Sequence, residues 1–166
     1  MNGYDKFLDN LKLKFDSDCE VIFLCIGTDR VIGDCVGPIT GSLLKNKIEK
    51  KYIYGDLEEN LTFTNISKKI HEIKVKFSNP YIVAIDAALS EEENIGKIFV
   101  NDGGIAIGHG LNKKEKKIGN VGIKVVVGKD YNDRNLNFRA LQNISLGKVI
   151  GFSKRISDGI IDTFYR

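Results

Sequence analysis

The chain has 166 residues, a formal net charge of +3, 42% hydrophobic residues and 28% charged residues, a balance typical of a globular protein with a buried core. The small net charge argues against a nucleic-acid partner, and no apolar run approaches the roughly 20 residues that cross a membrane. The N-terminus lacks the apolar segment of a signal peptide. We therefore expect one domain over residues 1–166, in the cytoplasm, with no nucleic-acid or membrane partner.

The first expected elements are an amphipathic helix and a buried strand. Apolar residues recur at helical spacing within residues 1–16, which predicts an N-terminal helix packed on a sheet. Residues 21–26 are uniformly apolar and rich in β-branched types, as in a strand buried on both faces. A glycine-rich loop carrying Asp34 follows. Pro38 then lies where the first turn of a helix tolerates proline, so residues 36–50 are expected to be helical.

The middle of the chain repeats this alternation of strand and helix. Residues 66–77 carry apolar side chains at helical spacing, and Asn79-Pro80 stops the helix. Residues 81–85 form a second apolar strand that is expected to end on Asp86. Two apolar strands with a helix between them are typical of a βαβ crossover, so we expect an α/β fold with a mostly parallel central sheet flanked by helices.

The last third of the chain is expected to add two strands and a long helix. Strands are expected at 97–100 and 121–128, and loops at 108–119 and 129–137. The apolar residues of the terminal segment repeat every three or four positions. This spacing predicts a helix over 145–165, with Ser145 as its N-cap.

Asp34 and Asp86 form the strongest candidate site. Each follows a buried apolar strand, and the carboxyl ends of neighbouring parallel strands, about 4.8 Å apart, lie on one edge of a sheet. Two carboxylates that close cannot both ionise cheaply, so one pKa rises and the pair can act as acid and base or share a metal. Either aspartate alone is better explained as a helix cap or turn residue, whereas the two together favour function.

Other residues of the glycine-rich loops are candidates for substrate contact. Asp29 and Arg30 follow the first strand, where they either form a solvated ion pair or touch substrate. Gly33 and Gly37 let the backbone turn and approach closely. His109 lies in a later glycine-flanked loop that could fold over the aspartates. It is either a substrate contact, a metal ligand or a turn residue with no partner.

The cysteines do not suggest a metal site. Cys19, Cys25 and Cys35 are odd in number and lack metal-ligand spacing. Cys25 falls in the first strand and is expected to be a core thiol. Cys35 adjoins Asp34, where it is either reactive or a small buried residue, and the second interpretation is favoured because free cysteine is so often buried.

Two stretches of the chain, FLCIGTDRVIGDCVGP and NPYIVAIDAAL, are specific enough to suggest relatives, and GLNK and LQNISL support them. They resemble the YyaC family of sporulation proteins. That family is similar to the germination protease of spores and to hydrogenase maturation endopeptidases, which have a central sheet between helices. The resemblance implies that Asp34, in GDCVGP, and Asp86, in AIDAAL, are the acids of an atypical aspartic peptidase. In the maturation endopeptidases the matching acids bind nickel with a histidine, which would be His109 here.

Three functions stay open. The first is a sporulation-associated, peptidase-like hydrolase without a cofactor, in which the two aspartates activate water to cleave a protein or peptide such as a spore protein. The second is an endopeptidase that depends on nickel or zinc bound by Asp34, Asp86 and His109. The third is a non-catalytic assembly or binding protein that keeps a peptidase fold. The resemblance further implies a location in the forespore or spore interior.

Overall fold

A five-stranded sheet forms the centre of the fold, in a computed structural model that describes residues 3–12, 19–107 and 116–165. The strands follow the order β2-β1-β3-β7-β4, and all neighbours are parallel except β4, which runs antiparallel to β7. The strands are β1 (Glu20–Cys25), β2 (Ile53–Tyr54), β3 (Pro80–Ser90), β4 (Ile98–Asp102) and β7 (Val121–Lys129). This mostly parallel sheet confirms the predicted fold class.

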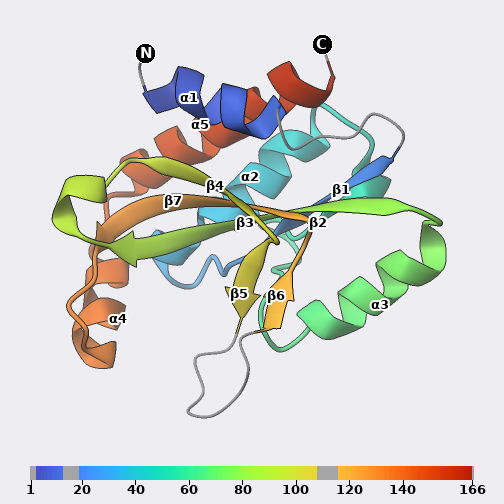
Figure 1. Ribbon diagram of the computed structural model, residues 1–166. Coiled ribbons are helices and arrows are strands. Elements are labelled where there is room, and N and C mark those ends of the chain that lie inside the picture. Colours follow the sequence, from blue (N-terminus) through green and yellow to red (C-terminus); the bar gives the residue numbers. More distant parts are fainter. Residues whose placement is uncertain (1–2, 13–18, 108–115, 166) are drawn as a thin grey trace.

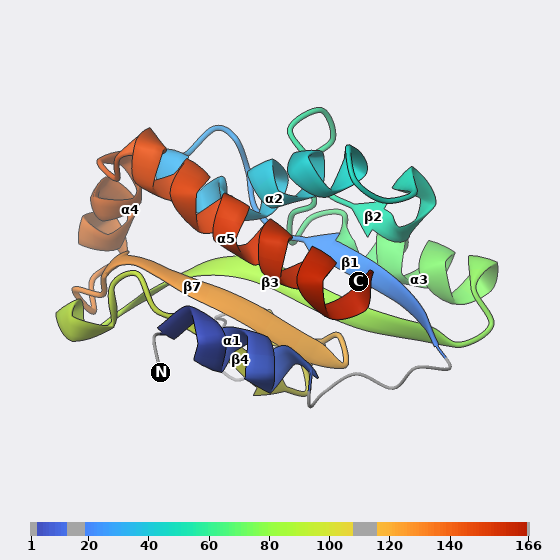
Figure 2. The same cartoon turned by 90° about the horizontal axis from the view of Figure 1, so that it is seen from above.

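Helices and a small hairpin cover the two faces of the sheet (Figure 1). On one face lie α1 (Gly3–Lys12), α2 (Val36–Lys45) and α5 (Leu146–Phe164). On the other lie α3 (Ile66–Lys76) and the antiparallel pair β5 (Ile105–Ile107) and β6 (Lys116–Ile118). Figure 2 shows α1 and α5 side by side above the sheet, and α4 (Arg134–Gln142) beyond one end of it.

The core consists of two layers because β1 and β3 are apolar on both faces. Phe23 and Ile85 point into the layer beneath α1, α2 and α5. Leu24 and Ala84, their neighbours in the chain, point into the layer beneath α3 and the β5–β6 hairpin. Side chains alternate between faces along a strand, so a strand buried on both sides needs an unbroken apolar run. The runs at 21–26 and 81–85 therefore predicted these strands correctly.

Several expected boundaries are wrong. β3 does not end on Asp86 but continues to Ser90, and β6 lies within the expected loop 108–119. The expected loop 129–137 contains the start of α4, where the Asp133 carboxylate accepts a hydrogen bond of 2.9 Å from the Leu136 amide. This helix cap went unnoticed because the segment is mostly polar and its few apolar residues do not recur at helical spacing.

Three helices also differ from expectation at their ends. α1 spans Gly3–Lys12 instead of 1–16, α2 ends at Lys45 instead of residue 50, and α5 spans Leu146–Phe164 within the expected 145–165. Ser145 occupies the N-cap position of α5, but its side chain makes no capping hydrogen bond with the part of the chain that is described. None of the helices described contains a stretch that is both long and apolar enough to cross a bilayer.

Candidate functional site

Strand register brings the segment of Asp34 beside Asp86. β1 and β3 are parallel neighbours, and the last residue of β1, Cys25, lies opposite Ile85. The next residue, Ile26, donates a backbone hydrogen bond of 2.8 Å to the Ile85 carbonyl, and then the chain leaves the sheet. β3 runs on past this level, so the loop after β1 lies alongside Asp86. The predicted adjacency of the two strands is confirmed, although Asp86 lies inside its strand.

Backbone contacts fix the position of Asp34 in this loop. Asp34 closes a short 3-10 helix, η1 (Ile32–Asp34), and its amide donates to the Val31 carbonyl at 3.0 Å. Its own carbonyl accepts the Thr28 amide at 3.0 Å. Gly27 has a φ of 142°, and a Cβ there would lie 2.1 Å from the Asp34 carbonyl oxygen. Only glycine therefore fits at position 27, which holds the loop against the end of β1.

The two carboxyl groups interact electrostatically. Burial raises the pKa of Asp34 to about 6, against the opposing effect of a hydrogen bond from the Thr28 backbone. Burial, followed by the charge of Asp34, raises the pKa of Asp86 to about 8. The Ala87 amide, which donates to Asp86 Oδ1 at 2.8 Å, and the charge of Lys124 oppose this second shift. Because the pKa of Asp86 is the higher of the two, the pair favours a state near pH 7 in which it shares one proton, held mainly by Asp86.

Lys124 is part of this neighbourhood and was missed by the sequence reasoning. It lies on β7 directly opposite Asp86 on β3, and both residues are half-buried. Residues paired across neighbouring strands point to the same face, so the ammonium and the carboxyl share the face of α3 and the hairpin. A lysine in the middle of the apolar stretch VGIKVVVG was the available signal, because a lone charge in a buried strand needs a reason.

The other predicted loop residues lie at the surface. The Asp29 amide donates to Asn60 Oδ1 at 3.1 Å, and the Arg30 amide donates to Thr28 Oγ1 at 3.2 Å. The side chains of Asp29 and Arg30 are both exposed, and within the described ranges no ion pair joins them. Their role in substrate contact stays a prediction. Asn60, which also contacts Thr28 Oγ1 at 3.1 Å, anchors this loop and was not identified from the sequence.

Gly33 and Gly37 are buried and allow close packing, as the sequence predicted. A Cβ at Gly33 would lie 2.8 Å from the Leu141 carbonyl oxygen, and one at Gly37 would lie 2.0 Å from the Ile26 carbonyl oxygen. Their predicted contact with substrate stays a prediction. Cys35 is also buried, and burial together with nearby acids raises its pKa to about 11. The Cys35 thiol is therefore protonated at neutral pH, which supports its interpretation as a small buried residue over that as a reactive cysteine.

Comparison with known proteins identifies the family to which this chain belongs. A family model described as "Protein of unknown function (DUF1256)" matches residues 1–159. The chain belongs to the DUF1256 family. It is 29% identical over 141 residues to "Uncharacterized protein YyaC" of Bacillus subtilis (strain 168). The matched segment covers 84% of this chain and 67% of that protein. The predicted resemblance to the YyaC family is therefore confirmed.

The fold of this DUF1256 chain is that of a known protease structure. The crystal structure of the [NiFe] hydrogenase maturation protease HycI from Thermococcus kodakarensis KOD1 superposes with a TM-score of 0.63, covering 94% of this chain and 99% of that one. The two sequences are 15% identical, so the likeness establishes a common fold.

A metal site needs more donors than the described part of the DUF1256 chain supplies. Asp34 and Asp86 provide carboxylate ligands, but no group of three or more His, Cys, Asp or Glu side chains within the described ranges could hold a metal ion. The third predicted ligand, His109, lies outside the described residues. Zinc sites use at least three protein ligands, so metal binding stays a prediction that depends on this histidine.

Proposed function

We propose that this DUF1256 protein is a peptidase-like hydrolase in which Asp34 and Asp86 share one proton and activate water on a peptide bond. The main support is the raised pKa of Asp86 beside a charged Asp34, because coupled acids with separated pKa values are typical of acid–base catalysis. The fold it shares with a maturation protease supports a protein substrate.

The mechanism assigns a different role to each acid. The Asp34 carboxylate takes a proton from a water molecule as the water oxygen bonds to the peptide carbonyl carbon. Asp86, protonated at neutral pH, gives its proton to the leaving amine nitrogen as the C–N bond breaks. Lys124 stabilises the Asp86 carboxylate that this step leaves behind. Asp34 then releases its proton to solvent and Asp86 takes one up, which restores the starting state.

An extended polypeptide is the substrate class that we favour. Two hollows of the described structure, of about 190 and 520 Å³, are lined by other residues and by neither aspartate. The fold shared with a maturation protease is what favours a polypeptide over a small molecule as the substrate. The sporulation role and the forespore location implied by the resemblance belong to this same proposal.

Two variants test the hydrolase. Asp34→Asn and Asp86→Asn are compared with the wild type and with Glu93→Gln, an exposed acid outside the site, by mass spectrometry of a diverse peptide library and of intact spore proteins. We expect cleavage by the wild type and the control and its loss in both aspartate variants, with folding verified by calorimetry. Cleavage that persists in both aspartate variants rejects the mechanism. An inactive wild type that retains an uncleaved partner would instead identify a binding protein.

A divalent-metal form of the site is a second candidate. Its support is the proximity of two acids with raised pKa values, because a divalent cation between them would remove the repulsion that keeps Asp86 protonated. Elemental analysis and titration with Ni²⁺ or Zn²⁺ test it. Asp86→Asn and His109→Ala should each weaken binding, and a wild type that neither contains nor takes up metal contradicts this candidate.

A further inference from the structure

A groove lies beside β2, away from the two aspartates. It has a volume of about 190 Å³, and we call it the β2 groove. Its floor is the edge strand Ile53–Tyr54 with the adjoining Gly55-Asp56. One wall comes from α3, and the other includes the 3-10 helix η2 (Lys50–Tyr52). The groove therefore combines a strand edge with two helical walls.

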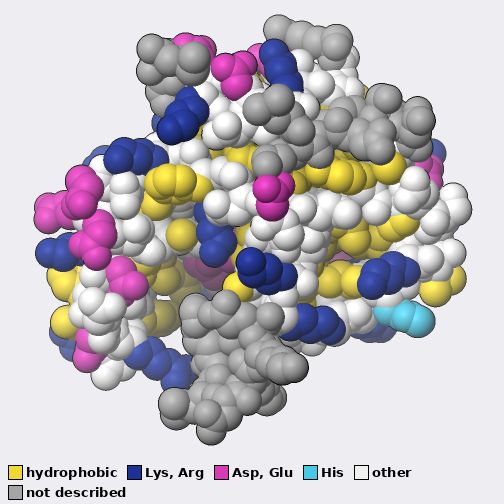
Figure 3. All heavy atoms as spheres, viewed as in Figure 1, with side chains coloured by type: hydrophobic (Ala, Val, Ile, Leu, Met, Phe, Trp, Pro, Cys, Tyr) yellow, Lys and Arg dark blue, Asp and Glu magenta, His cyan; other side chains and the backbone are white. Residues whose placement is uncertain are grey.

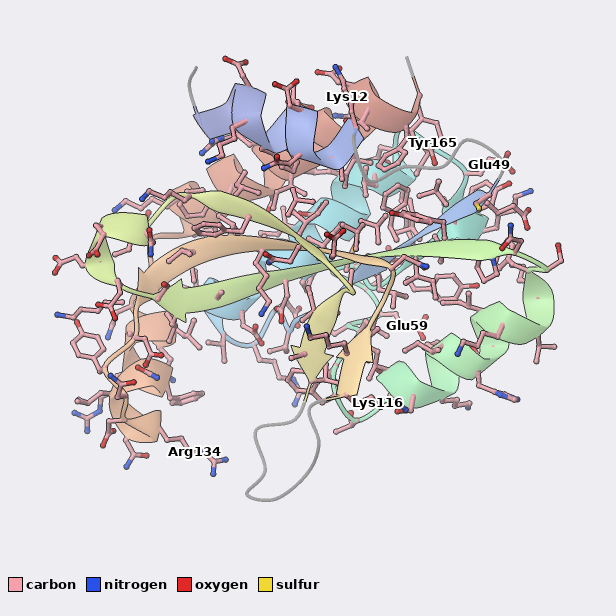
Figure 4. The ribbon with its side chains drawn as sticks, viewed as in Figure 1. Lys12, Glu49, Glu59, Lys116, Arg134 and Tyr165 are labelled. Carbon is pink, nitrogen blue, oxygen red and sulfur yellow. The ribbon has the colours of Figure 1, made fainter. Side chains whose placement is uncertain are left out.

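The β2 groove is strongly basic. Five lysines line it, against two acids: Lys45, Lys50, Lys51, Lys69 and Lys76, with Asp56 and Glu59. Both acids are already engaged. Asp56, which is 3% exposed, pairs with Lys45 and accepts the amides of Glu58 and Glu59. Glu59, labelled in Figure 4 on the α3 side of the sheet, pairs with Lys69 at 3.0 Å.

Two of the lysines keep their charge available. Lys50 and Lys76 are exposed on opposite walls, and no acidic side chain within the described residues forms an ion pair with either of them. Lys76 instead lies over the Phe77 ring, 5.3 Å from its centroid. On the face seen in Figure 3, acidic side chains gather over the turn that holds η3 (Glu92–Asn94), while basic ones lie over α3 and the hairpin. The groove itself carries an excess of positive charge, because five lysines line it and its two acids are both paired.

The shape of the β2 groove suits an extended chain. β2 is an edge strand, and away from β1 it has no partner strand among the described residues, so its outward backbone groups are available for pairing. Lys69 and Lys76 lie two helical turns apart, a span of about 10 Å along α3. An extended segment of about three residues covers the same length. A compact anion would use only part of this length.

We propose that the β2 groove binds an extended acidic segment of a partner protein, which adds to the sheet along β2 while its carboxylates pair with Lys50 and Lys76. Backbone pairing supplies the alignment and the lysines supply the preference for acidic side chains. Asn60 connects this groove to the loop of Asp34, since it lines the groove and holds Thr28 and Asp29. Binding in the groove does not require that the aspartates hydrolyse anything.

Fluorescence anisotropy with a labelled acidic decapeptide of glutamate, aspartate and valine tests the inference. The Asp86→Asn protein is used, so that cleavage cannot remove the probe. We expect saturable binding that weakens as salt rises. Lys50→Glu/Lys76→Glu should weaken it by about tenfold or more, because two attractions become repulsions. Lys148→Glu/Lys154→Glu is the matched control, with two exposed lysines of α5 reversed, and should bind like the parent.

Two further probes separate backbone pairing from simple charge attraction. The same peptide with every second amide N-methylated should bind at least about tenfold more weakly if it pairs with β2. Equal binding of the methylated peptide, equal weakening by both double variants, or preferential binding of pyrophosphate or single-stranded DNA overturns the inference. None of these results depends on whether the wild type cleaves peptides, so failure here is distinguishable from failure of the proposed hydrolase.

Discussion

Replacing Asp86 by asparagine should stabilise the protein by an amount that grows with pH. An unfolded chain ionises this carboxyl near its ordinary pKa of 3.8, whereas the folded protein keeps it protonated up to about 8. Between these values the unfolded state binds fewer protons than the folded state, so the wild-type free energy of unfolding falls as pH rises. Asparagine does not titrate and still offers an oxygen to the Ala87 amide, which makes it the appropriate comparison.

The magnitude follows from the width of this window. Within this window the wild-type free energy of unfolding falls by about 1.4 kcal/mol for each pH unit. The difference in stability between variant and wild type can therefore grow by at most about 4 kcal/mol between pH 4 and pH 7. Asp86 is half-buried and keeps some contact with water, which screens part of the penalty, so we expect a gain of about 2 kcal/mol at pH 7. Near pH 4 the variant and the wild type should be equally stable. Above pH 8 the difference should become constant.

Urea unfolding of both proteins at half-unit intervals from pH 4 to pH 9 measures this difference. Glu93→Gln, on an exposed acid, should differ from the wild type by the same small amount at every pH. A pH-independent difference for Asp86→Asn would refute the idea that burial and Asp34 hold the Asp86 carboxyl in its protonated form. A variant that loses stability relative to the wild type as pH rises would refute it equally, because the ionised carboxylate would then be the favoured native form.

Three further outcomes are expected. Any hydrolytic rate should follow a bell-shaped pH profile between about 6 and 8, since one site acid must be charged and the other protonated, and a flat kcat/KM from pH 5 to pH 9 contradicts this. In thermal unfolding, Gly37→Ala should destabilise by about 2 kcal/mol or more because its Cβ would strike the Ile26 carbonyl, whereas Gly151→Ala, in open space on α5, should stabilise by about 0.5–1 kcal/mol. Asp56→Ala should cost about 2–4 kcal/mol at pH 7 in urea unfolding, because it strands Lys45 and two amides. Since the folded pKa of Asp56 is lowered, that cost is present above its unfolded pKa and should shrink as pH falls through the folded value; equal cost at pH 2 and pH 7 would contradict the pairing.

Local sequence patterns predicted much of the architecture because the spacing of apolar residues reports which faces of a segment must be buried. The apolar runs at 21–26 and 81–85 had to be strands buried on both faces, and the helical spacing after them required crossover helices, so a mostly parallel sheet followed. The short elements were not predicted correctly, because a short or exposed element carries little local pattern. The β5–β6 hairpin has three residues in each strand, too short for a periodic signal. A helical turn is expected over 138–143, but none of the α4 residues is buried, so nothing in the sequence marked its start at Arg134.

The sequence by itself selected Asp34 and Asp86, since each comes after an unbroken apolar run of residues, and it supplied the glycines that let the first loop pack tightly. Only the tertiary structure decided that β1 stops one residue before the level of Asp86 while β3 continues, which is what leaves room for the loop of Asp34. It also placed Lys124 opposite Asp86 and Asn60 beneath the loop. Strand register and contacts between distant segments follow from how whole elements pack against one another, and no local pattern of residues contains that information.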